Sequence, residues 1–487
     1  MSQASAAGHA GLTGTLGRAM PRLIAVLLVA PLSLHLPFAP AHAQTLQEAL
    51  TAAYEDNPQL EAERARLRAV DEQVPQALSG WRPTVRAFGN AGVRQIDSNR
   101  ESVLGSENAL LAPNAVGAEI DQPLFRGGQT TAQTHQAENA VRAEQARLAA
   151  TEQRVLLDAA VAFVDVFRDQ SELALNIRNE QRLDRQLDAT RDRFKVGEVT
   201  RTDVFQAEAR LARATAQRIQ AEGRLETSRA DYRNVIGRAP GAVERPPLPS
   251  SLPATLEEAI DQAIDGNPGL TARAFDERSA LDNVDRVRGQ LWPTLRLTGR
   301  VARDYEATRN DSRLNTYEAL VRMDVPLYQA GVVYSQLREA KQSVAEQRRL
   351  LDQVHRATVR DATEGWAQLL TARAAIASRN KQVEANQVAL QGVQREAEVG
   401  SRTVLDILDA EQEVLDSQVD LVRAQRDEVV AAYQLKTALG EMTAERLGLS
   451  VRYYDPQRHY HEVRDDWVGG SSSGDIGDDA SRTGPVR

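Results

Sequence analysis

Two acidic side chains, Asp406 and Asp409, stand three positions apart in the segment Asp-Ile-Leu-Asp. Side chains at this spacing share one face of a helix, so both carboxylates can point the same way. If several copies of the chain lined a narrow tube, these carboxylates would form two stacked acidic rings. Such rings favour cations, and crowding raises the pKa of some members. The alternative is stabilisation of a helix N-terminus by negative charge, which is worth about 0.3–1 kcal/mol.

A second group of residues marks two sharp turns. Val196-Gly197 and Val399-Gly400 each end a long polar segment, and hydroxyl-bearing residues follow within a few positions. Glycine closes a helix in the left-handed conformation, and a serine or threonine side chain can cap the next helix. The candidate caps are Thr200, Thr202, Ser401 and Thr403. The pattern therefore predicts two helical hairpins with these glycines at their tips.

The sequence lacks the residues that most catalytic and metal sites require. It has no cysteine, which excludes a disulfide framework, a thiolate metal site and a cysteine nucleophile. His459 and His461 have no companion acidic pattern, and the sequence contains no Gly-rich phosphate loop, nucleophile elbow or metalloprotease helix. We therefore expect neither an enzyme nor a cofactor.

Composition narrows the class further. The 487 residues carry 59 basic and 68 acidic side chains, a formal net charge of −9, and the basic residues are spread along the chain. This distribution argues against nucleic acid as a partner. The mean hydropathy of −0.45 is too low for a bundle of membrane-spanning helices.

The N-terminal segment has the layout of a secretory signal peptide. Arg18 and Arg22 precede the apolar run 23–30, prolines follow, and Ala41-His-Ala43 offers a cleavage site. A membrane anchor is the alternative, but the run is shorter than the ~20 residues that a spanning helix needs. We therefore expect residues 1–43 to be removed and any membrane crossing to be made by strands.

The remainder of the chain repeats itself. Thr45-Leu-Gln-Glu-Ala-Leu50 returns as Thr255-Leu-Glu-Glu-Ala-Ile260, and Asp121-Gln-Pro-Leu-Phe125 returns as Asp324-Val-Pro-Leu-Tyr328. These matches predict an internal tandem duplication. The predicted parts are a first copy, a Pro-rich linker, a second copy and a C-terminal segment with a disordered tail: 44–240, 241–254, 255–440 and 441–487.

Each copy is expected to contain the same elements in the same order. A short helical stretch precedes two strands in which apolar residues alternate with charged ones, as at Val116, Ala118 and Ile120. A long helix and a shorter helix follow, and heptad spacing of large and small residues in the shorter one favours coiled-coil packing. The predicted strands cover about 84–95, 115–125, 294–303 and 316–327. The predicted helices are 129–196, 202–236, 332–399 and 403–439.

The number of strands indicates that several chains assemble. One chain supplies four strands, whereas a membrane barrel needs at least about eight and tolerates no unpaired edge in lipid. Three copies would give a twelve-stranded barrel, and the long helices would continue it as a tube. The alternative is a periplasmic structural coiled-coil protein without a pore, which does not account for the strands.

The sequence resembles the TolC family of outer-membrane efflux and type I secretion channels. The duplicated plan, the Asp-x-Pro-Leu-[Phe/Tyr] motif and the paired Val-Gly turns carry the resemblance over about residues 45–440. It implies a mixed α+β homotrimer, with a twelve-stranded β-barrel in the lipid of the outer membrane, a long periplasmic α-helical barrel and an equatorial region that includes part of 441–487. It also implies an exit duct that receives substrate from an inner-membrane ABC or proton-driven transporter through a periplasmic adaptor protein.

The resemblance assigns roles to the two groups of residues described above. Asp406 and Asp409 match the acidic constriction of the family's closed entrance. The residues that match its gating network are Arg402, Thr202 and Asp203. The residues that match the periplasmic tip, where the adaptor docks, are Val196, Gly197, Val399 and Gly400. The family often has a tyrosine three residues before the second tip glycine, where this chain has Ala397.

Overall fold

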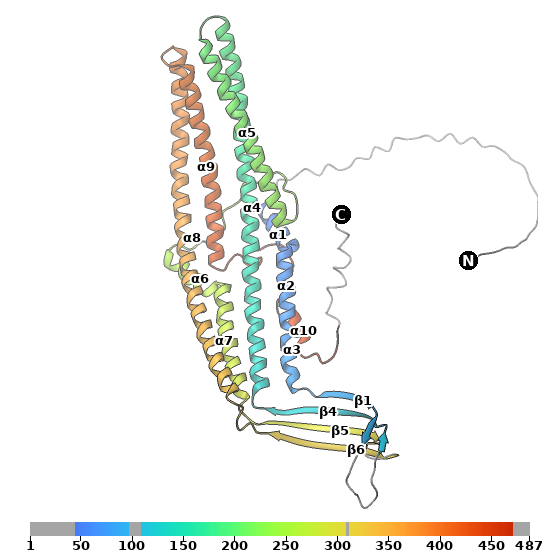
Figure 1. Ribbon diagram of the computed structural model, residues 1–487. Helices are drawn as coiled ribbons and strands as arrows, with labels where there is room; N and C mark the ends of the chain where they lie inside the picture. The colour runs from blue at the N-terminus through green and yellow to red at the C-terminus, as the bar shows by residue number, and fades with distance from the viewer. Residues whose placement is uncertain (1–43, 97–108, 308–310, 471–487) are drawn as a thin grey trace, which may run out of the picture. The chain divides into compact units, whose positions relative to one another are not determined.

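The computed structural model describes residues 44–96, 109–307 and 311–470 (Figure 1). The predicted signal peptide and residues 471–487 of the predicted tail lie outside this part of the chain. Within it, long helices join a four-stranded sheet at one of their ends (Figure 1). No helix among these residues combines the length and the apolar character that a membrane span requires.

Short helices lead into the sheet in both halves of the chain. In the first half they are α1 (Leu46–Asp56), α2 (Pro58–Asp71), α3 (Gln73–Leu78) and the 3-10 turn η1 (Ser79–Trp81). In the second half they are α6 (Leu256–Gly266) and α7 (Pro268–Gly289). Thr45 and Thr255 cap α1 and α6, whereas Asn57 and Asn267 cap the helices that begin with proline. The repeated threonine and Asn-Pro signals therefore mark helix starts in both halves.

Two long hairpins make up most of the fold. The first pairs α4 (Gln129–Lys195) with α5 (Arg201–Ile236), and the second pairs α8 (Val332–Glu398) with α9 (Val404–Ala438). Each long helix has 67 residues, about 100 Å at 1.5 Å per residue. Ala207, Ala214 and Ala221 of α5 recur every seven residues and are buried, which allows close helix approach. Both hairpin turns lie at the end of the helices opposite to the sheet (Figure 1).

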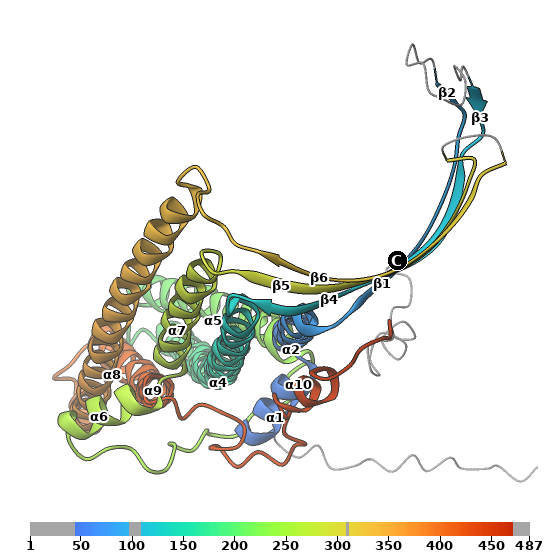
Figure 2. The same cartoon turned by 90° about the horizontal axis from the view of Figure 1, so that it is seen from below.

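The sheet is antiparallel, with the strand order β1-β4-β5-β6. Its strands are β1 (Thr84–Ala91), β4 (Asn114–Arg126), β5 (Thr294–Tyr305) and β6 (Arg313–Asp324). One row of paired residues is charged throughout, with the sign alternating from strand to strand: Arg86, Glu119, Arg300 and Glu318. In the neighbouring row, Val85 pairs with Ile120 on the opposite face of the sheet. The sheet therefore has one charged face and one apolar face, and it curves away from the helix ends (Figure 2).

The prediction of one continuous strand over 84–95 is wrong. The strand β1 ends at Ala91. A separate strand, β2 (Arg94–Ile96), follows after two residues and pairs with β3 (Ala109–Leu111) in a two-stranded sheet of its own. Gly92 lies at the break, and a glycine inside a strand weakens the ladder because it has no side chain to pack.

The predicted strand 316–327 is displaced. The strand β6 begins earlier, at Arg313, and ends at Asp324, two residues before Pro326. Proline has no backbone N–H, so it cannot continue a hydrogen-bonded ladder. In β4, by contrast, Pro123 is accommodated at a bulge in the pairing with β5.

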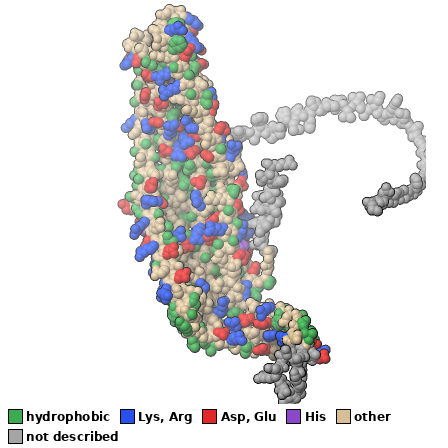
Figure 3. Space-filling view, in the orientation of Figure 1, with side chains coloured by type: hydrophobic (Ala, Val, Ile, Leu, Met, Phe, Trp, Pro, Cys, Tyr) green, Lys and Arg blue, Asp and Glu red, His purple; other side chains and the backbone are tan. Residues whose placement is uncertain are grey.

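The largest apolar core lies midway along the helices. It joins α1, α4, α5 and the end of α9 to the segment that follows α9, and its largest fully buried side chains include Phe163, Leu156, Tyr232 and Met442. After this core the chain runs to α10 (Arg458–Val463), which lies beside α2 (Figure 2). Acidic and basic side chains are interspersed over the helical surface seen in Figure 3. The charge of the chain is therefore not gathered into one patch on this face.

Candidate entrance at the hairpin tips

The two hairpin tips have the same backbone construction. Gly197 and Gly400 have φ values of +81° and +79°, the left-handed conformation that a helix-closing glycine adopts. Each glycine N–H donates to a carbonyl three residues earlier, at 3.0 Å. Val196 and Val399, which precede the glycines, are 72% and 80% exposed. Each tip therefore presents a bare apolar side chain.

The structure selects Thr200 and Thr403 from the four candidate caps. Each forms a capping box with the aspartate three residues later, Asp203 or Asp406. The Oδ2 atom of Asp406 accepts from the backbone N–H and the hydroxyl of Thr403, both at 2.8 Å. These hydrogen bonds, the backbone one first, lower the pKa of Asp406. Within one chain, the side-chain contacts of Asp406 are therefore those of a helix-capping residue.

Two other predicted gate residues, Asp409 and Arg402, have separate partners. Asp409 pairs with Arg210, which ties α9 to α5. Arg402 pairs with Glu396 on its own hairpin, Nε to Oε2 at 2.9 Å. Among the described contacts within one chain, none joins Arg402 to Thr202 or Asp203. Among these residues, Asp409 therefore contacts the neighbouring hairpin. The described side-chain contacts of Arg402 and Asp203 stay within their own hairpins.

A buried acid near the tips was not predicted. Glu411 of α9 is 5% exposed, and its Oε2 atom has no hydrogen-bond partner among the described residues. It lies one turn from Leu408, which packs with Leu183 and Ala214 of the other hairpin. Burial raises its pKa, and Arg182 partly opposes this shift. The sequence held a signal: Glu411 interrupts the apolar stripe formed by Val404, Leu408 and Leu415.

We expect Glu411→Gln to stabilise the packed tips at alkaline pH, by about 1–2 kcal/mol. The folded pKa is raised above its unfolded value, so ionisation destabilises the folded state. Stability should therefore rise as pH falls through the folded pKa, and the amide should abolish this dependence. Thermal unfolding followed by circular dichroism at several pH values measures it. The matched control is Glu413→Gln, on the exposed face of α9. A lower unfolding midpoint for Glu411→Gln at alkaline pH would contradict the assignment.

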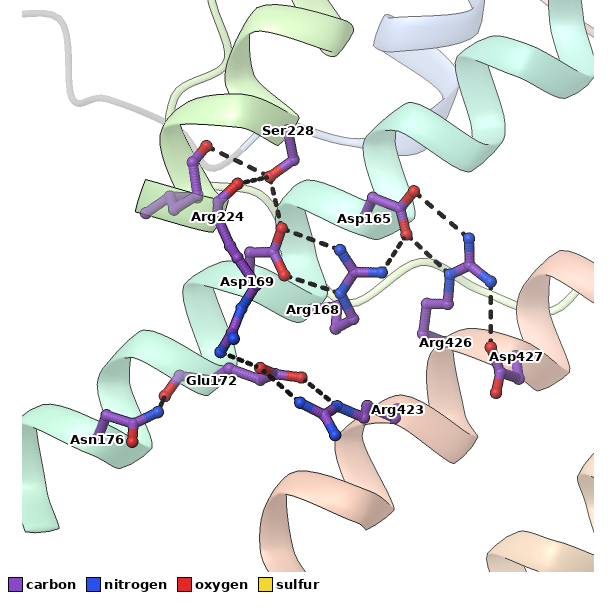
Figure 4. A network of polar contacts seen from close by, with 11 residues as sticks. Asp165, Arg168, Asp169, Glu172, Asn176, Arg224, Ser228, Arg423, Arg426 and Asp427 are labelled. Carbon is purple, nitrogen blue, oxygen red and sulfur yellow. Dashed lines mark hydrogen bonds and ion pairs between the residues drawn. The ribbon is translucent and has the colours of Figure 1, made fainter. Parts of the chain in front are cut away.

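A cluster of ion pairs joins α4, α5 and α9 halfway along the helices (Figure 4). We call it the mid-helix cluster; its residues are Asp165, Arg168, Asp169, Glu172, Arg224, Ser228, Arg423 and Arg426. Glu172, only 2% exposed, binds Arg224 of α5 at 3.0 Å and Arg423 of α9 at 2.8 Å. The cluster therefore fastens three helices to one another.

Two other acids of α4 complete the cluster. Asp169, also 2% exposed, binds Arg168 and accepts from the Ser228 hydroxyl of α5 at 2.6 Å. Asp165 binds Arg426 of α9 at 2.8 Å. The spacing of the three acids, at 165, 169 and 172, places them on one stripe of α4. This stripe is visible in the sequence, but its partners lie on helices whose relative register no local pattern specifies.

Long helical hairpins with capped tips, joined to a small antiparallel sheet with one charged and one apolar face, are the fold of solved outer-membrane channels. The chain matches the family described as "Outer membrane efflux protein" over residues 49–238 and 259–441. It belongs to this family. It is an outer-membrane exit duct for efflux or type I secretion, with a helical extension in the periplasm.

Individual relatives agree with this assignment. The chain is 34% identical to the outer membrane efflux protein BepC of Brucella suis over 430 residues, which cover 88% of this chain and 92% of BepC. It is 27% identical to the outer membrane protein TolC of Vibrio cholerae over 413 residues, 82% of this chain and 92% of TolC. The solved structure of the outer membrane protein VceC from Vibrio cholerae has the same fold, with a TM-score of 0.72 at 18% identity over 81% of this chain and 96% of VceC.

Proposed function

We propose that three copies of the chain form one channel, in which three four-stranded sheets close into a twelve-stranded barrel in the lipid of the outer membrane. The strand order supports this, because β1 and β6 lie at the edges of the sheet and each leaves one backbone edge open to a second copy. Closure would remove both edges. The like order of elements in the two halves supports the tandem duplication, and residues 1–43 act as a signal peptide that is removed.

The two faces of the sheet support the same orientation. The charged row that includes Arg86 and Glu119, whose Nη2 and Oε2 atoms are 3.0 Å apart, faces the lumen of the barrel. The apolar face, which carries Val85, Ile120 and Val301, contacts lipid. The other candidate, a periplasmic coiled-coil protein without a pore, does not account for a sheet that exposes one apolar face to the surroundings.

The hairpin tips form the periplasmic entrance. Asp406 and Asp409 of three chains line it as acidic rings, and Arg402, Thr202 and Asp203 hold it shut through contacts between hairpins of neighbouring chains. The exposed valines of the tips, with Gly197 and Gly400 behind them, dock a periplasmic adaptor. The adaptor connects the duct to an inner-membrane transporter, either an ABC or a proton-driven pump, which supplies energy and selects the substrate.

Planar-bilayer conductance under a salt gradient tests the proposal. Detergent-purified protein that begins at Gln44 should give small steps whose reversal potential shows cation preference. The variant Arg402→Ser should conduct more, because it removes the guanidinium to which the proposal assigns contacts between hairpins. Protein that stays soluble without detergent and is silent in both forms would contradict a channel and favour the structural coiled coil.

A further inference from the structure

The segment after α9 is fastened along α4 in the direction of the sheet. We call residues 441–470 the C-terminal strap. Three side chains of α4, seven residues apart and hence on one face, contact it in turn. Glu152, Gln145 and Glu138 contact Ala444, Pro456 and Arg464 at 2.7, 3.3 and 3.7 Å. Because α4 begins at the sheet, this order shows that the strap approaches the sheet as it proceeds.

The other side of the strap is fixed to α1 and α2. The backbone N–H of Tyr454 donates to the Tyr54 hydroxyl at 2.9 Å, and the guanidinium of Arg64 lies over both tyrosine rings. Further along, Nδ1 of His459 lies 3.1 Å from Oδ2 of the fully buried Asp71. The C-terminal strap is therefore held against α1, α2 and α4 by specific contacts.

The strap delivers an exposed tryptophan to the junction between helices and sheet. Arg82 donates to the carbonyl oxygen of Asp466, and its guanidinium lies 4.9 Å from the ring centroid of Trp467. Arg82 stands two residues before β1. Trp467 is nevertheless 66% exposed, and the adjacent Val468 is 93% exposed. An aromatic and an aliphatic side chain are thus held in solvent at the place where the sheet begins.

We propose that Trp467, positioned by Arg82, binds the headgroup region of the periplasmic leaflet of the outer membrane. This inference rests on the proposed function, in which the sheet crosses that membrane. Val85, which lies on the apolar face of the sheet and is 74% exposed, follows Arg82 by three residues, so the strap ends within a few residues of the first apolar side chain of β1. Tryptophan concentrates at membrane interfaces, and arginine pairs with lipid phosphate. A C-terminal strap of this kind ties the helical tube to the membrane surface.

Tryptophan fluorescence in lipid vesicles tests the contact. The chain has four tryptophans, Trp81, Trp292, Trp366 and Trp467, so replacing the other three by phenylalanine leaves Trp467 as the reporter. The protein is reconstituted in phosphatidylethanolamine and phosphatidylglycerol containing lipids brominated either near the headgroup or near the chain end. We expect quenching by the shallow bromines to exceed that by the deep ones about twofold. Arg82→Ala in this variant should reduce the shallow quenching.

Two further reporters separate this inference from the proposed function. A variant that keeps only Trp366, which packs against the α6, α8 and α9 core, should not be quenched. A variant with Val301→Trp as its single tryptophan probes the apolar face of β5. If this strand probe is quenched by deep bromines and Trp467 is not quenched at all, the strap inference is overturned and the channel stands. If the strand probe is also unquenched, the proposed membrane-spanning sheet fails.

Discussion

Asp169→Ala is expected to lower the free energy of unfolding of the helical region by about 2–3 kcal/mol. Asp169 is 2% exposed and binds Arg168 through two bonds, Oδ1 to Nε at 2.8 Å and Oδ2 to Nη2 at 3.0 Å. The substitution leaves the Arg168 guanidinium and the buried Ser228 hydroxyl without this acceptor. The side chain of Arg168 is 25% exposed, so water compensates it in part, and the expected loss lies below that of a fully buried pair.

The measurement is thermal unfolding by circular dichroism in detergent, with two comparisons. Asp361→Ala removes the partner of Arg360 in an ion pair on α8 whose side chains are 71% and 50% exposed, and should change stability by less than about 0.5 kcal/mol. The double variant Asp169→Ala with Ser228→Ala should be destabilised by less than the sum of the two single effects, because both substitutions remove the same hydrogen bond between Ser228 and Asp169. If Asp169→Ala destabilises the protein no more than Asp361→Ala does, the mid-helix cluster does not stabilise the helical region as we expect.

The position of the cluster matters for the entrance. Arg423 and Arg426 fix α9 to α4 midway along the hairpins. Between this level and the tips, the described polar and apolar ties from α9 to the other hairpin include the Asp409–Arg210 pair and the packing of Leu408. Separation of the tips therefore has to break these ties, whereas the cluster can stay intact as the fixed point.

Local signals specified the helices and their ends well. Residues 129–196 contain neither glycine nor proline, and the helix there is Gln129–Lys195. The Val-Gly turns and the following threonines were readable because a left-handed glycine and a capping hydroxyl act within a few residues. The end of β6 was misjudged even though Pro326 is a local signal, because apolar alternation continues past the last paired residue.

Contacts between distant segments could not be predicted in this way. Glu172 and Arg423 are 251 positions apart, and their pairing depends on the axial register of α9 against α4. That register is set by the summed packing of two long helices, to which no single spacing in the sequence corresponds. For the same reason, the spacing of Asp406 and Asp409 predicts that they share one helix face, but it does not predict that Arg210 pairs with Asp409 alone.

This difference leads to an unequal contribution of the two acids to ion selectivity. Asp406→Asn should lower the cation-to-anion permeability ratio about five- to tenfold, and Asp409→Asn should lower it less. The charge of Asp409 is already paired with Arg210, whereas Asp406 keeps its charge through hydrogen bonds to Thr403. Those bonds lower the pKa of Asp406 below its ordinary value of 3.8 and oppose the rise that crowding in a ring causes. The carboxylate should therefore stay ionised, and selectivity should persist, as pH falls to about 5.

The choice of asparagine separates charge from capping. Its side-chain oxygen can still accept from the Thr403 backbone N–H, so the helix start is retained while the charge is lost. Thr403→Ala does the reverse: it removes the capping hydroxyl, at about 1 kcal/mol of helix stability, and leaves both carboxylates in place. Reversal potentials in planar bilayers should therefore shift for Asp406→Asn and stay near the parent value for Thr403→Ala. If only Thr403→Ala shifts them, Asp406 serves the entrance as a cap, and its charge does not select the ions that pass.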